Sequence, residues 1–93
     1  MSEENLTPEQ EVWRGERAKQ LLNEPLIKEA LDAIETLLIE QWRSTPIKDQ
    51  EMREKIWMMF NIKRNFVQRM TEHIETGKIA SLQMKQPKRF GIF

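Results

Sequence analysis

Few residues in this chain could perform acid–base or metal chemistry. His73 is the single histidine and cysteine is absent. Catalysis needs a tuned acid, base or nucleophile beside a second functional group in a pocket, and a metal site of imidazole and sulfur ligands cannot be completed from one histidine. The predicted place of His73, in the last turns of a helix, favours a structural role. We therefore expect no enzyme, no catalytic, cofactor-binding or metal-binding residue, and no small-molecule substrate.

Basic side chains form a second group that could bind a ligand. Clustered lysine and arginine bind phosphate backbones because binding releases counterions. Here Glu72 and Glu75 interrupt the cations, and the isoelectric point of about 6.6 lies below that of typical nucleic-acid binders. The candidates for contact with nucleic acid or with an acidic partner are Lys63, Arg64, Arg69, Lys78, Lys85, Lys88 and Arg89.

Aromatic side chains and methionines form a third group, and these residue types are frequent at protein interfaces. In the Trp57-Met58-Met59-Phe60 cluster, the helical spacing of Met59 and Phe60 is typical of a core, whereas Trp57 and Met58 lie partly off that line. The basic and aromatic C-terminal tail, residues 87–93, either docks in a groove of a partner with an acidic rim or is a frayed end. The candidates for apolar partner contacts are Trp57, Met58, Ile62, Phe66, Phe90 and Phe93.

The composition is typical of a single helical domain over residues 1–93 in the cytoplasm. Charged residues make up 32 % and the mean hydropathy is -0.69. No apolar run approaches the roughly 18 residues of a membrane span, and the acidic N-terminus is unlike a signal peptide. The net charge of +0 hides an asymmetry, since residues 1–50 hold 11 acidic and 6 basic side chains and residues 51–93 hold 4 and 9.

The prolines and caps predict an all-α fold. The pattern predicts helices over about 8–22, 26–43 and 47–76, with Gly77 as a left-handed C-cap and a short helix or tail after it. Residues 1–6 and 87–93 are predicted to be flexible. We expect the second and third helices to form an antiparallel hairpin and the first helix to pack across it.

The predicted hairpin carries wide apolar stripes. The stripe of the second helix, predicted to be buried, is Ile27, Ala30, Leu31, Ile34, Leu37, Leu38 and Trp42. The main seam of the third helix is Met52, Ile56, Met59, Phe60, Val67, Met70 and Ile74. With Trp57, Met58, Ile62 and Phe66 beside it, this face is too wide for one partner helix, so either the first helix or a second copy of the chain covers the excess.

Three segments of the chain are similar to segments of a known family: residues 14–26 (RGERAKQLLNEPL), Trp42 with residues 53–57 (REKIW), and residues 75–80 (ETGKIA). With its R-G-x-x-A-x-x-L-L opening and late E-T-G-K-x-A, the chain resembles, over about residues 14–80, a family of short all-helical proteins of tailed bacteriophages and prophages. These are often encoded near head and DNA-packaging genes. The resemblance implies no catalytic residue.

The leading expectation is thus a small phage protein that works by protein–protein interaction in virion assembly or DNA packaging. It would bind another phage protein and itself, in the cytoplasm of the host cell or in the virion. One alternative is a nucleic-acid-binding module, such as a small packaging-initiation component. The other is a phage-encoded inhibitor of a host protein.

Overall fold

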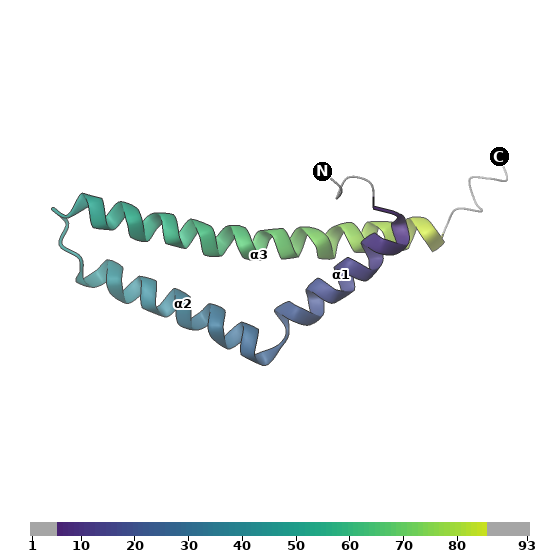
Figure 1. The fold of residues 1–93 in the computed structure, drawn as a ribbon, viewed down its shortest axis with the longest axis horizontal. Coiled ribbons are helices and arrows are strands. Elements are labelled where there is room, and N and C mark those ends of the chain that lie inside the picture. The colour runs from purple at the N-terminus through teal and green to yellow at the C-terminus, as the bar shows by residue number, and fades with distance from the viewer. Residues whose placement is uncertain (1–5, 86–93) are drawn as a thin grey trace. The chain divides into compact units, whose positions relative to one another are not determined.

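The computed structural model describes residues 6–85, which form three helices (Figure 1). These are α1 (Pro8–Leu22), α2 (Pro25–Ser44) and α3 (Gln50–Lys85). The predicted all-α class is confirmed, and no strand occurs over 6–85. The segments predicted to be flexible, 1–6 and 87–93, lie outside the described residues except for Leu6.

Local hydrogen bonds explain where each helix begins. Thr7 and Gln10 form a capping box, in which the Gln10 amide donates to Thr7 Oγ1 (3.2 Å) and the Thr7 amide donates to Gln10 Oε1 (2.9 Å). The Glu24 carboxylate accepts from the Leu26 amide (2.8 Å) at the start of α2. The Asp49 carboxylate accepts from the Met52 amide (3.2 Å) at the start of α3.

Helix α3 corrects the predicted end of the third helix. It continues past Thr76 to Lys85 as one element, so the predicted short fourth helix is the last part of α3. Gly77 is not a left-handed C-cap, because no glycine with a positive φ occurs in the described chain. The glycine instead meets a packing requirement inside the helix, where it allows α1 to approach closely.

The described residues form two compact units, 6–21 with 69–85 and 22–68, and α3 contributes to both. In the first unit, α1 packs against residues 69–85 through small side chains, and Gly15, Ala18, Gly77 and Ala80 are all buried. A Cβ atom on Gly15 would lie 2.7 Å from the His73 carbonyl oxygen, and one on Gly77 would lie 2.9 Å from that of Glu11. The two helices therefore touch backbone to backbone, which only glycine permits.

The second unit is an antiparallel hairpin of α2 and the first part of α3, as predicted (Figure 1). Leu38 and Ile56 are its buried apolar side chains, at 4 % and 0 % exposure. Arg53, near the start of α3, contacts the end of α2 and the turn that follows it. Its guanidinium donates to the Thr45 carbonyl (2.9 Å) and lies 3.8 Å from the centre of the Trp42 ring.

We expect Gly77→Ala to lower the free energy of unfolding by about 1–3 kcal/mol, because the new methyl group meets backbone atoms that cannot move aside cheaply. At an exposed helix position the same change stabilises by up to about 1 kcal/mol, so the predicted sign is reversed. Urea denaturation followed by circular dichroism measures the difference. Thr76→Ala, one residue away and exposed, is the control and should not destabilise. A stabilised Gly77→Ala protein would contradict the close contact.

Candidate protein-binding surface

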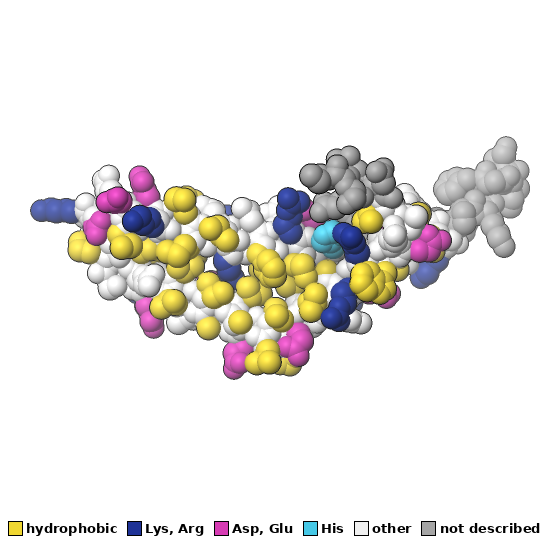
Figure 2. Space-filling view, viewed as in Figure 1, with side chains coloured by type: hydrophobic (Ala, Val, Ile, Leu, Met, Phe, Trp, Pro, Cys, Tyr) yellow, Lys and Arg dark blue, Asp and Glu magenta, His cyan; other side chains and the backbone are white. Residues whose placement is uncertain are grey.

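The described chain buries few apolar side chains and exposes many. Its buried hydrophobic residues are Ala18, Leu38, Ile56 and Ala80, whereas sixteen large hydrophobic side chains are at least 36 % exposed. On the face shown in Figure 2, hydrophobic side chains gather along the line between α2 and the first part of α3. Contiguous apolar surface of this kind marks a place where a protein binds another molecule. The candidate site is therefore the surface of the hairpin.

One groove of the hairpin, which we call the apolar groove, has a volume of about 600 Å³. It lies between α2 and α3 and holds half-exposed side chains from both helices, such as Leu37 (53 %), Ile62 (65 %) and Phe66 (48 %). Lys63 is the one charged residue in its lining. The complete lining is Leu31, Ile34, Leu37, Leu38, Gln41, Met59, Ile62, Lys63 and Phe66.

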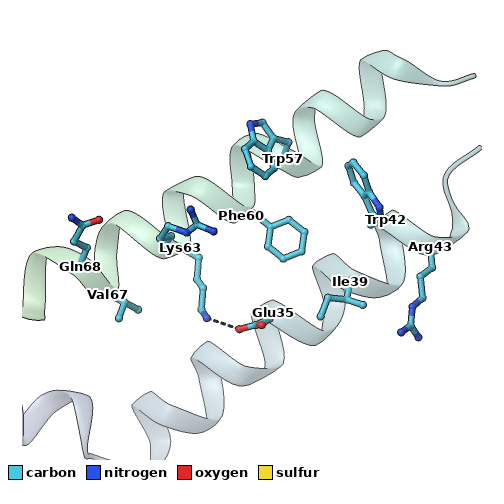
Figure 3. Close-up of a pocket in the computed structure, with 10 residues that line it drawn as sticks. Glu35, Ile39, Trp42, Arg43, Trp57, Phe60, Lys63, Val67 and Gln68 are labelled. Atoms are coloured by element: carbon cyan, nitrogen blue, oxygen red, sulfur yellow. Dashed lines mark hydrogen bonds and ion pairs between the residues drawn. The ribbon is translucent and has the colours of Figure 1, made fainter. Parts of the chain in front are cut away.

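A second groove of the hairpin, the tryptophan groove, has a volume of about 610 Å³ (Figure 3). In the figure Phe60 projects from α3 and Trp42 from α2 into the space between the helices, with Trp57 above them on α3. Arg43 and Arg64 add positive charge to this aromatic lining. The complete lining is Glu35, Ile39, Trp42, Arg43, Trp57, Phe60, Lys63, Arg64, Val67 and Gln68.

Lys63 and Glu35 form an ion pair between the two helices. The Lys63 ammonium donates to Glu35 Oε1 at 2.7 Å (Figure 3). This hydrogen bond, and then the positive charge of Lys63, lower the pKa of Glu35 below its usual value of 4.5. The pair neutralises the one cation that the apolar groove contains.

The predicted apolar contacts divide between these surfaces. Trp57, Met58, Ile62 and Phe66 are all about half exposed or more. Ile62 and Phe66 line the apolar groove, Trp57 lines the tryptophan groove, and Met58 is in neither lining. Phe90 and Phe93 lie outside the described residues. That these side chains contact a partner stays a prediction.

The predicted basic contacts do not gather in one place. Lys63 is held by Glu35, and Arg64 lines the tryptophan groove. Arg69 and Lys78 belong to the first unit, in hollows that also hold the carboxylates Glu11, Glu72 and Glu16. Lys85 is the last residue of α3, and Lys88 and Arg89 lie outside the described residues. Among the described candidates, only Lys63 and Arg64 share a groove, and Arg69 and Lys78 lie beside carboxylates.

Sequence reasoning missed the contribution of α2 to these grooves. Ile34, Leu37 and Trp42 were expected to be buried, yet they are 44 %, 53 % and 36 % exposed. The same expectation is wrong for Met52 and Met59 of the α3 seam, which are 43 % and 42 % exposed. The signal that could have found these residues is the width of the stripes, because a single partner helix covers only one line of side chains.

His73 lies in the middle of α3 rather than near its end, so the predicted gain from exposed helix-end carbonyls is wrong. It lines a hollow with Glu11 and Glu72, without a hydrogen bond to either. Over residues 6–85, no group of three or more histidine, cysteine or carboxylate residues could hold a metal ion. None of the three described helices is long and apolar enough to cross a membrane.

No protein-family model matches this chain, and neither a curated protein nor a solved structure shows a detectable similarity to it. The resemblance to phage proteins therefore stays a prediction.

The lowered pKa of Glu35 gives the hairpin a dependence on acid. Because the folded pKa lies below the unfolded one, the ion pair contributes stability above pH 4.5, and that contribution is lost as the pH falls through the folded pKa. We expect the Glu35→Gln protein to have a lower free energy of unfolding than the unchanged protein near neutral pH. The difference should shrink as the pH falls below 4.5 and through the folded pKa of Glu35. Denaturant unfolding between about pH 3 and pH 7 measures this. Glu40→Gln, on the same helix and exposed, should show no such closing gap.

Proposed function

We propose that this chain is a non-enzymatic protein-binding module and that the α2–α3 hairpin is the part that binds. The observation that carries this proposal is the imbalance between exposed and buried apolar side chains on the hairpin. Water leaves half-exposed leucine, isoleucine and phenylalanine side chains when another apolar surface covers them, and that transfer drives most protein association. The apolar groove and the tryptophan groove are two surfaces of the hairpin that another protein could cover in this way.

The chemistry of the grooves supports a protein rather than a small molecule as the ligand. The apolar groove has only Gln41 and Lys63 as polar residues in its lining, which leaves few groups to orient a substrate. The tryptophan groove combines aromatic side chains with Arg43 and Arg64, a combination that is enriched at the energetic centres of protein interfaces. It suits an apolar segment that carries acidic residues.

The context of this binding rests on the resemblance alone. The likeness to short proteins of tailed bacteriophages supports a role in virion assembly or DNA packaging, with another phage protein as partner, in the host-cell cytoplasm or the virion. The dispersed cations and the Lys63–Glu35 pair give less support to a nucleic-acid-binding role.

Light-scattering mass with and without a DNA duplex, at about 0.05 M and about 0.5 M salt, tests the class of partner. We expect the duplex to leave the mass unchanged at both salt concentrations, because binding by apolar surface does not depend on released counterions. A mass that rises with the duplex at low salt and returns at high salt would instead establish the nucleic-acid role. Arg64→Gln with Lys85→Gln, both exposed candidate contacts on α3, would then weaken that shift.

A further inference from the structure

We infer that the apolar groove is closed by the same groove of a second copy of this chain, so that two hairpins form a symmetric four-helix bundle. This inference rests on the proposed function and names the partner of one of its two surfaces. The other surface, the tryptophan groove, stays open to a different protein.

Helix α3 carries two adjacent stripes along the hairpin. In the first, Ile56, Phe60 and Val67 are apolar and Lys63 is the one charged member; they recur at alternating spacings of four and three residues and form the seam toward α2. Met59, Ile62 and Phe66 repeat that spacing one position away and line the apolar groove. Two adjacent stripes are what a helix carries when it has two helical neighbours, as in a four-helix bundle.

Helix α2 has the same second stripe on the same side of the hairpin. Leu26, Ala30, Ile34, Leu37 and Gln41 fall on one side of this helix at 3.6 residues per turn. None is charged, and Ile34, Leu37 and Gln41 line the apolar groove. The hairpin thus presents one surface made by two antiparallel helices, in which Lys63 is the one charged residue of the groove lining. Such a surface is half of a bundle.

The low charge of this surface favours a second copy of the chain over a partner with charged side chains. Lys63 is the single charged group in the groove lining, and Glu35 already neutralises it at 2.7 Å. A partner with acidic or basic side chains would have to desolvate them there without a counter-charge, which is costly. The surface of a second copy brings only its own Lys63, already paired with Glu35, and repeats the two-helix stripe by a two-fold rotation.

The exposed area is sufficient for a stable dimer. Leu26 (70 %), Leu37 (53 %) and Ile62 (65 %) are among the most exposed, and Ile34, Met59 and Phe66 add 42 to 48 % each. Together these expose on the order of 550 Å² per copy, at about 150 to 200 Å² for a large side chain. Two copies would bury about 1,100 Å² in total, which clears the roughly 1,000 Å² expected of a specific interface.

The hairpin also needs a partner that is always present. Leu38 and Ile56 are its buried apolar side chains, and a domain with so small a core depends on additional packing or oligomerisation. A second copy is made at the same place and in the same amount as the first. The closing surface is therefore available whenever the hairpin folds.

Sedimentation or light-scattering mass of the full chain tests this inference. We expect a species of twice 11.2 kDa, and we expect Ile62→Glu and Leu37→Glu to raise its dissociation constant by at least about 100-fold, because the symmetric contact buries each new charge twice. The matched control is Ile79→Glu, which makes the same change on the same helix at a residue that is 57 % exposed and lines no groove. It should stay dimeric.

The thermal midpoint keeps the test valid if a variant is less stable. In a dimer coupled to folding, the midpoint rises with protein concentration, so it should rise for the unchanged protein and for Ile79→Glu but not for Ile62→Glu. If the unchanged protein is a monomer, the inference of a second copy is wrong. It is also wrong if the Trp57→Glu protein is monomeric while the Ile62→Glu protein remains a dimer. The DNA test stays separate: a monomer that ignores DNA overturns the second copy and leaves protein binding standing, whereas a dimer that binds DNA keeps the second copy and makes nucleic acid, not another protein, the further partner.

Discussion

Two helices touch along a single line, and this constraint decides what the hairpin exposes. An apolar stripe wider than that line cannot be buried by one neighbour, however well the two helices pack. Leu38 and Ile56 lie on the line and are buried, while Leu37 and Ile62 lie beside it and stay half exposed. The two grooves of the hairpin follow from this geometry, because each side of the contact line leaves apolar side chains without a neighbour.

Lys63 lies in the α3 seam, between Phe60 and Val67, where an apolar residue would pack more simply. Its partner Glu35 is on α2, and the two charges meet at 2.7 Å only when the helices are aligned as they are. Sliding α2 by one turn, about 5.4 Å, would separate the charges and leave a half-buried ammonium without its partner. The ion pair thus favours this alignment of the hairpin, together with the packing of Leu38 and Ile56.

Local signals predicted most of the fold. Thr7 with Gln10 and the prolines predicted where α1 and α2 begin, because a cap or a proline acts within a few residues of itself. Gly77 was misinterpreted because a glycine after a helical stretch has two uses, a left-handed end or a close approach. The second depends on α1, which lies more than fifty residues away in the sequence.

The candidate site was predicted only in part, for a similar reason. Periodicity shows which side of a helix is apolar, and it correctly set Ile62 and Phe66 beside the main seam. It does not show whether a neighbour covers that side. Leu37 and Trp42 were therefore expected in a core that the hairpin does not have. The contribution of Phe90 and Phe93 remains a prediction.

The contact between Gly15 and Gly77 also limits how this sequence can change over time. In most helix pairs a larger residue on one side can be accommodated by a smaller one on the other, so the interface drifts by paired exchange. Here each glycine faces the backbone of the opposite helix, and no residue is smaller than glycine. Neither position can compensate for a change at the other, so a sequence that keeps the docking of α1 must keep both.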